Sequence, residues 1–393
     1  MGMNIGMFTD IYRPAINGVT RSIDTIKTSL EARGHTVYIF APAVRNHPKE
    51  ERVIRLPSIK RLSPKEAPLG LAYVPFLTDK VRELELDIIH THLPFFIGGL
   101  GYRIANKLSI PKIHTYHTHL TEYAHYSPVP GIQWPVKFGL RRLTKRYCNN
   151  SDYVIAPSTA IKDLLLSYGV KKPIVVNPTG IVCEDFKRLT QTEKTQLFQQ
   201  YAIPTNQQII LFGGRLAKEK NLLFLLDCFS VIAQNNTNVH LVFAGGGPME
   251  DVLEKHIQRL DLISRVTITG LLDKSEIAKF FGSADVFAFP SYTETQGIVL
   301  AEAMAAGCPV VAIDALGSKD AVHEGIDGFL VANDQNAFTA KLLQILNDDI
   351  LQKRFSKAAI VSAQQFSVKN TTDRLLAIYA DAIKDRSQTT TAA

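Results

Sequence analysis

Short apolar runs alternate along the chain with longer segments in which apolar residues recur every three or four positions. The runs predict buried strands, and the longer segments predict amphipathic helices. A predicted helix over 19–33 ends at Gly34, a residue suited to the left-handed position that follows a helix. This alternation predicts a parallel sheet with helices on both faces. In the first half of the chain the predicted strands are 4–8, 36–40, 87–90, 112–116, 153–156 and 173–176.

The alternation starts again in the second half. A turn at 177–181 and a polar helix over 193–201 separate the halves, so the change of domain is predicted within 175–205. Two doubly wound domains in tandem place a ligand cleft at the C-terminal edges of their sheets. The small, polar residues 387–393 are predicted to be disordered. The strands predicted in this half are 209–212, 239–244, 266–269, 286–289, 309–312 and 328–331.

Composition narrows the class of protein. With 393 residues, 46% of them apolar, the chain can build two cores. It has no apolar run near the roughly 20 residues that span a bilayer and no signal-peptide pattern at its start. The four scattered cysteines form no CxxC pair, which favours a reducing cytoplasm without a disulfide framework or zinc. The net charge of +7 favours anionic ligands or an anionic membrane and does not by itself indicate nucleic acid.

Residues 291–302 follow a predicted strand and run into a predicted helix. The backbone amides of Gln296, Gly297 and Ile298 are predicted to be unpaired at the helix start, where they could bind phosphate. Glu294 is on the loop, and Glu302 is in the helix. Two carboxylates beside a phosphate-binding element favour a ligand with a phosphate and several hydroxyls, such as a nucleotide sugar. A loop–helix junction with two solvated glutamates is the alternative.

Two glycine-rich loops follow other strands of the second half. Gly214 permits close backbone approach, and Arg215 and Lys220 supply positive charge for phosphate oxygens. The segment is no Walker loop, and a basic surface turn is the alternative. The three glycines around Gly246 suit a nucleotide base or phosphate, or equally a tightly packed turn.

In the first half, Asn17 and Gly18 follow the first strand. Their amides could reach a phosphate or a sugar, or they could form a plain turn with Thr20 at the helix start.

Histidines gather near two strand ends of the first half. This density favours one histidine that hydrogen-bonds the reacting substrate while the others pack, with Glu122 and Tyr126 extending a polar wall. Zinc is a weaker alternative, because HExxH and cysteine partners are absent. The histidines are His90, His92, His114, His117, His119 and His125.

A basic segment follows the histidines, with no acidic residue between Glu122 and Asp152. On a helix its apolar and basic residues separate onto two faces, and Trp134, the only tryptophan, lies at its start. The pattern favours a helix that lies on anionic lipid. A core helix with a solvated basic face is the alternative, and RNA binding is a poorer one because no nucleic-acid motif accompanies the charge. The basic residues are Lys137, Arg141, Arg142, Lys145 and Arg146.

Taken together, these motifs resemble the retaining family 4 glycosyltransferases of GT-B fold over nearly the whole chain. Glu294 and Glu302 match that family's E-x7-E motif, and the segments 213–221, 17–19 and 177–181 fit the same family. Within it, segments 89–95 and 114–126 are similar to the bacterial diacylglycerol glucosyltransferases.

The resemblance implies two Rossmann-like domains facing across a cleft. These would be an acceptor domain (1–180) that a C-terminal helix (368–386) rejoins, a donor domain (181–367) and the tail 387–393. It implies retaining transfer of glucose from UDP-glucose to 1,2-diacylglycerol, by a peripheral protein on the cytoplasmic face of the cell membrane. The alternatives are another lipid such as a phosphoinositide, a soluble sugar acceptor, or a non-catalytic nucleotide-sugar-binding regulator. No protein partner is expected.

The resemblance also implies roles for the matching residues. Glu294 would bind the sugar hydroxyls and Glu302 the ribose, while Arg215 and Lys220 would neutralise the diphosphate. His117 would contact the sugar near the reaction centre. Gln296 departs from the aromatic residue typical of the family. No D-x-D triplet occurs, so no metal is expected in the active site. The other donor-binding positions would be Gly18, Gly214, Gly246, Thr295, Gln296, Gly297 and Ile298.

Overall fold

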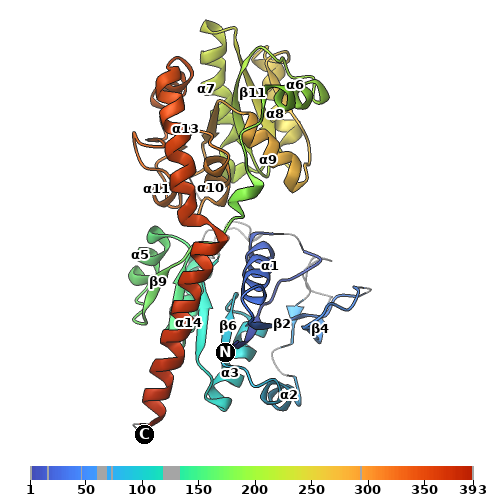
Figure 1. The fold of residues 1–393 in the computed structure, drawn as a ribbon, viewed down its shortest axis with the longest axis vertical. Helices are drawn as coiled ribbons and strands as arrows, with labels where there is room; N and C mark the ends of the chain where they lie inside the picture. Colours follow the sequence, from blue (N-terminus) through green and yellow to red (C-terminus); the bar gives the residue numbers. More distant parts are fainter. Residues whose placement is uncertain are drawn as a thin grey trace. The chain divides into compact units, whose positions relative to one another are not determined.

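The computed structural model describes residues 2–15, 17–45, 47–59, 69–71, 74–117, 133–292 and 294–391. It consists of two compact units, Met1–Gly180 with Val368–Ala393, and Ile181–Ser367 (Figure 1). Each unit contains a parallel sheet with helices between its strands, which confirms the predicted class of two doubly wound α/β domains.

The first unit has a seven-stranded parallel sheet in the order β3-β2-β1-β6-β7-β8-β9. The edge strand β3 was not predicted, because its first three residues are only partly buried and its apolar run is interrupted by Arg55. A two-stranded antiparallel ribbon, β4 with β5, accompanies this sheet. The strands are β1 Asn4–Phe8, β2 Thr36–Pro42, β3 Val53–Leu56, β4 Ser58–Ile59, β5 Leu69–Gly70, β6 Ile88–Thr91, β7 Lys112–Thr115, β8 Tyr153–Ala156 and β9 Ile174–Val176.

Two helix layers cover this sheet. Helices α1 and α14 cover one face, where Ile5, Ile88 and Ile113 pack with Leu375 and Tyr379 of α14 (Figure 1). The opposite face carries the core around α2 and α3 and the cluster between α4 and α5. Successive strand residues point to opposite faces, so these apolar runs fill both cores. The helices are α1 Gly18–Glu31, α2 Leu77–Glu83, α3 Phe96–Leu108, α4 Gln133–Asn149, α5 Thr159–Ser167 and α14 Val368–Thr391.

The C-terminal helix packs in the first unit, as the resemblance implied, and it is longer than expected. Residues 387–391 continue the helix, so the prediction of a disordered tail was wrong for them. Residues 368–391 contain neither glycine nor proline, so nothing in this sequence ends the helix after the last buried turn.

The second unit has a six-stranded parallel sheet in the order β12-β11-β10-β13-β14-β15. Strand order reverses between β10 and β13, so the loops that follow these two strands emerge side by side. The strands are β10 Gln208–Gly213, β11 Val239–Ala244, β12 Val266–Ile268, β13 Val286–Phe289, β14 Val310–Ile313 and β15 Gly328–Val331. The helices are α6 Gln191–Gln200, α7 Leu222–Asn235, α8 Glu250–Arg259, α9 Lys274–Ser283, α10 Ile298–Ala305, α11 Ser318–Ala321, α12 Gln335–Leu346 and α13 Asp349–Ala363, with short 3-10 turns at Cys183–Asp185, Lys218–Lys220 and Gln364–Phe366.

Candidate active site

The loops after β10 and β13 bring Lys220 and Glu294 together. The Nζ atom of Lys220 lies 2.7 Å from Oε2 of Glu294, and both side chains are about one-fifth exposed, at 20% and 21%. The same ammonium group lies 5.7 Å from the ring centroid of Phe289, which is fully buried at the end of β13. The sequence-predicted cation and carboxylate thus form one ion pair above an aromatic ring.

Glu294 also takes backbone amides at the start of α10. Its carboxylate accepts a hydrogen bond from the N–H of Thr295 and one from the backbone of Gly297, which adopts the left-handed conformation as N-cap. An unpaired Gly297 amide was expected from the sequence. That expectation was wrong, because the glutamate three positions earlier folds back onto it.

These partners decide the charge of Glu294. Burial alone raises the pKa of its carboxyl group, but the Lys220 charge, the Lys220 hydrogen bond and the two backbone amides outweigh burial and leave the pKa below its usual value. Glu294 is therefore ionised at neutral pH, and its acceptor oxygens suit hydroxyl groups of a ligand.

The loop that carries Arg215 rests on the glycine trio. A methyl group on Gly245 would overlap the carbonyl oxygen of Gly214, and one on Gly247 would overlap the backbone of Leu216. The Leu216 N–H also donates to the carbonyl oxygen of Gly246 at 3.0 Å. The contacts of Gly245 and Gly247 therefore agree with the alternative of a tightly packed turn. Both glycines support the loop on which Arg215 is exposed.

Gly317 supports the loop of Glu294, a role that the sequence analysis missed. Its N–H donates to the carbonyl oxygen of Glu294 at 2.9 Å. An added methyl group would lie 2.7 Å from the backbone nitrogen of Gln296 and 2.9 Å from the carbonyl oxygen of Glu294. Gln296 is buried, and Glu302 is half-buried in α10. A glycine shortly after a predicted strand was the only signal of this support in the sequence.

If the loop binds a nucleotide-sugar donor, as the resemblance implies, Gly317→Ala should raise the KM for that donor about tenfold, because the methyl group displaces the backbone of residues 294–296. The residue is right-handed, so alanine itself brings no backbone strain. Steady-state kinetics with varied donor would measure the effect. Gly99→Ala is the matched control, since its methyl group meets nothing within 4 Å. An unchanged donor KM in Gly317→Ala would contradict the proposed support.

In the first unit, Gly18 is the first residue of α1 and is exposed. The side chain of Asn17 caps this helix by accepting from the Thr20 N–H at 3.0 Å. A methyl group on Gly18 would meet nothing within 4 Å, so its backbone stays accessible. Asn17 thus lies in the turn at the helix start. The exposed backbone of Gly18 is still compatible with contact to a phosphate or a sugar.

The histidines on and just after β6 and β7 lie on both sides of the sheet. His90 and His92 are buried on the α1 and α14 side, beside the partly buried His117, and the Nδ1 atom of His92 lies 2.9 Å from Nε2 of His117. His114 lies on the other side, against the ring of Tyr147. Burial lowers the pKa of His117 to about 4 and that of His114 to about 3, so both are neutral at pH 7. The predicted positions His119, Glu122, His125 and Tyr126 lie outside the described residues.

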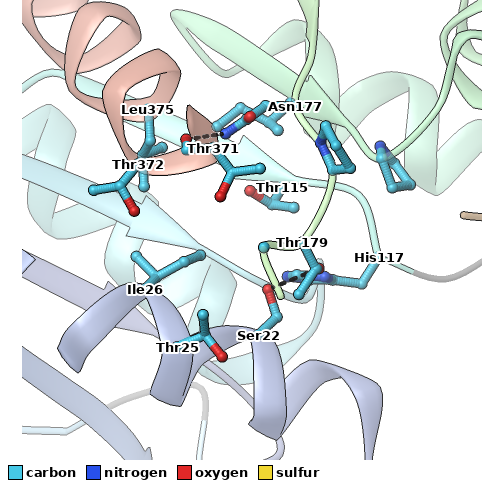
Figure 2. A pocket seen from close by; sticks show the side chains of 14 residues that line it. Ser22, Thr25, Ile26, Thr115, His117, Asn177, Thr179, Thr371, Thr372 and Leu375 are labelled. Atoms are coloured by element: carbon cyan, nitrogen blue, oxygen red, sulfur yellow. Dashed lines mark hydrogen bonds between the residues drawn. The ribbon is translucent and has the colours of Figure 1, made fainter. Parts of the chain in front are cut away.

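His117 also lines a small polar cavity at the strand ends of the first unit (Figure 2). Its volume of about 20 Å³ has room for one water molecule. Hydroxyl groups of Ser22, Thr115 and Thr179 surround it together with Thr371 of α14. The cavity beside His117 is therefore large enough for one water molecule and too small for a sugar ring.

Helix α4 carries the basic residues in two groups. Arg141 donates to the carbonyl oxygen of Ser167 at 2.6 Å and lies over the ring of Tyr168, and Lys145 lies against Gly169, so both are held by the end of α5. Arg142 instead lies over the ring of Phe138, which is 51% exposed, and Lys137 is exposed nearby in the sequence. Trp134 belongs to α4, but its side chain lies outside the described part of the chain.

Within the described residues, no three His, Cys, Asp or Glu side chains are placed to hold a metal ion. None of the helices in the described ranges is both long and apolar enough to cross a membrane.

Comparisons with known proteins identify the architecture. Residues 16–185 match the model of Glycosyltransferase Family 4, and residues 193–361 match that of Glycosyl transferases group 1. The chain is 36% identical over 314 residues to an alpha-monoglucosyldiacylglycerol synthase of Streptococcus pneumoniae, covering 79% of this chain and 71% of the relative. The chain belongs to the family 4 glycosyltransferases.

Two further matches cover almost the whole of this chain. An alpha-monoglucosyldiacylglycerol synthase of Acholeplasma laidlawii is 28% identical over 97% of this chain and 98% of its own. The crystal structure of Anabaena Alr3699/HepE in complex with UDP and glucose superposes with a TM-score of 0.74 at 20% identity, covering 96% of this chain and all of the other. The structural match confirms the GT-B fold.

Proposed function

We propose that this glycosyltransferase moves glucose from UDP-glucose to the free hydroxyl of 1,2-diacylglycerol at an anionic membrane surface, with retention of anomeric configuration. The observation that carries the proposal is the ion pair of Lys220 with Glu294 at the start of α10, in a chain similar to alpha-monoglucosyldiacylglycerol synthases.

The donor chemistry follows from the residues of the second unit. As the bond between the sugar C1 and the diphosphate oxygen breaks, negative charge grows on UDP. Lys220 and Arg215 offset that charge without a metal, and fixed cations lower the barrier because they need no reorganisation. Glu294, ionised at neutral pH, accepts hydrogen bonds from the glucose hydroxyls, and Glu302 is assigned the ribose.

The acceptor chemistry is assigned to the first unit. A neutral His117 can donate or accept one hydrogen bond, and we assign it the sugar near C1. The acceptor hydroxyl attacks C1 on the face that UDP leaves, its proton passes to the departing phosphate oxygen, and the α-linkage of the donor is kept. The word "alpha" in the names of both relatives supports this stereochemistry.

The test is a matrix of donors and acceptors with the purified chain. UDP-glucose, UDP-galactose and GDP-mannose would each be offered with diacylglycerol vesicles, phosphoinositide vesicles and soluble sugars, and products identified by mass spectrometry. We expect glucosyl-diacylglycerol from UDP-glucose. Transfer only to soluble sugars would overturn the acceptor, and UDP binding without product from any acceptor would favour a regulator.

Membrane attraction is proposed for the exposed residues of α4. Replacing both Lys137 and Arg142 by Ser should weaken binding to anionic vesicles roughly 30-fold, since each cation near such a surface contributes about 1 kcal/mol. Vesicle sedimentation at several ionic strengths would measure it. The double change Lys255→Ser with Lys279→Ser removes the same charge from exposed positions of the second unit and should leave binding unchanged.

The residues held by α5 should behave differently. Arg141→Ser removes the hydrogen bond to Ser167 and the contact with Tyr168, so we expect lower thermal stability and a smaller effect on vesicle binding than that of Arg142→Ser. Equal sedimentation of the Lys137 and Arg142 double variant and the wild type would contradict the membrane assignment.

A further inference from the structure

The first unit contains a buried row of hydrogen-bonding side chains that runs from the C-terminal helix to His117. We propose that Tyr379, His90 and His92 are positioning residues that hold the imidazole of His117 in one orientation and one tautomer. This inference rests on the proposed function, because it gives His117 a contact with the reacting sugar.

The first part of the row joins α14 to the sheet. Tyr379 of α14 is fully buried, and its hydroxyl lies 2.7 Å from Nδ1 of His90 on β6. The Nε2 atom of His90 lies 2.7 Å from Oγ1 of Thr115 on β7. Both ring nitrogens of a fully buried histidine are therefore engaged, and its ring has one permitted orientation.

The second part passes from ring to ring. The rings of His90 and His92 are 4.3 Å apart between centroids, and those of His92 and His117 are 5.2 Å apart and stacked. A displaced His90 ring would leave a void beside His92, and close-packed interiors transmit such displacements. Only the last ring, His117, is partly open to its surroundings.

The tautomer of His92 determines the tautomer of His117. Burial lowers the pKa of both rings, so each is neutral and carries one N–H. Nδ1 of His92 faces Nε2 of His117, and a hydrogen bond between them requires one protonated and one bare nitrogen. The tautomer of His92 therefore decides whether the other nitrogen of His117, Nδ1, is a donor or an acceptor.

Helix α14, which supplies Tyr379, follows the whole second unit in the chain. The chain leaves the first unit at Gly180 and re-enters it at Val368, so Tyr379 arrives only after the whole second unit. Helix α14 closes the core over β1, β6 and β7, and the same helix supplies the end of the row. The orientation of His117 therefore depends on the packing of the C-terminal helix.

Three variants test the proposal, and a fourth serves as the control. Tyr379→Phe removes one hydroxyl and should lower kcat roughly five- to tenfold, the effect of losing one positioning hydrogen bond. His92→Gln loses the polar atom at the Nδ1 position and should lower kcat roughly 100-fold, whereas His92→Asn keeps one there and should stay within about tenfold of the wild type. The Kd for UDP should change less than about twofold in all three, because UDP lacks the sugar that His117 is assigned to contact.

Tyr153→Phe is the matched control. The Tyr153 hydroxyl donates to Asp385 of the same helix at 2.9 Å, outside the histidine row. Removing it alters another tyrosine hydroxyl contact with α14 and should leave kcat within about twofold of the wild type.

A spectroscopic arm separates this inference from the proposed function. With 15N-labelled histidine, Tyr379→Phe should shift the ring-nitrogen signals of His90, His92 and His117, while those of His240, His256 and His323 in the second unit stay in place. A shift confined to His90, or shifted signals with unchanged kcat, would overturn the positioning role. If the wild type transfers no glucose to any acceptor, the proposed function fails, and the spectra still decide whether the row couples Tyr379 to His117.

Discussion

Replacing Lys220 by Ala is expected to lower kcat/KM for glucosyl transfer about 1,000-fold, because one preorganised charge on a departing anion supplies up to about 4 kcal/mol of transition-state stabilisation. The affinity for UDP should fall as well, since the ammonium group is lost from the phosphates. Initial rates of UDP release with diacylglycerol vesicles and calorimetric titration of UDP would measure the two effects separately.

Lys218→Ala is the control for this prediction. Lys218 is exposed in the same 3-10 turn, two positions before Lys220, so its replacement removes equal charge without touching Glu294. Its rates should stay within about twofold of the wild type. Glu294→Gln adds a second comparison: the side chain keeps its shape but loses the charge, so kcat should fall with a smaller change in UDP affinity. More than a tenth of wild-type activity in Lys220→Ala would contradict the assignment.

Acidification should destabilise the first unit steeply between pH 7.5 and 5.5. His90, His92, His114 and His117 have pKa values below 6.5 in the folded chain because of burial, so the unfolded chain binds more protons as the pH falls through 6.5. The stability is fully present above pH 6.5 and is lost below it, down to a pKa of about 4 for His117 and about 3 for His114. Asp10 partly opposes this loss, because burial raises its pKa to about 6 and the folded chain then takes up a proton.

At pH 5.5, four such histidines lower the free energy of unfolding by about 5 kcal/mol, and Asp10 raises it by about 1 kcal/mol. The net decrease of about 4 kcal/mol is close to the whole stability of many domains. Hydrogen exchange of the two units at pH 7.5, 6.5 and 5.5 would localise it. His114→Gln should reduce the pH slope of the first unit by about one proton, whatever it does to stability at pH 7.5. A slope of one proton or fewer in the wild type would contradict the account.

The strands were predictable where both faces of the sheet are covered. The run 286–289, for example, is buried throughout and contains no polar residue. The edge strand β3 was missed because it is only partly covered. Strand ends carry the polar loops in any parallel sheet, so the positions of Lys220, Glu294 and His117 were also visible along the chain.

The sequence alone determined the class of fold, the order of its elements and the residue types that could bind an anionic sugar donor, because these depend on local periodicity and on chemistry at strand ends. Only the tertiary structure determined which side chains contact each other. Lys220 meets Glu294 across 74 positions, Tyr379 meets His90 across 289, and Arg141 turns from the expected lipid face to the end of α5. Such contacts depend on which loops a strand order brings together and on which buried polar atoms must find a partner, and neither is written in the spacing of residues along the chain.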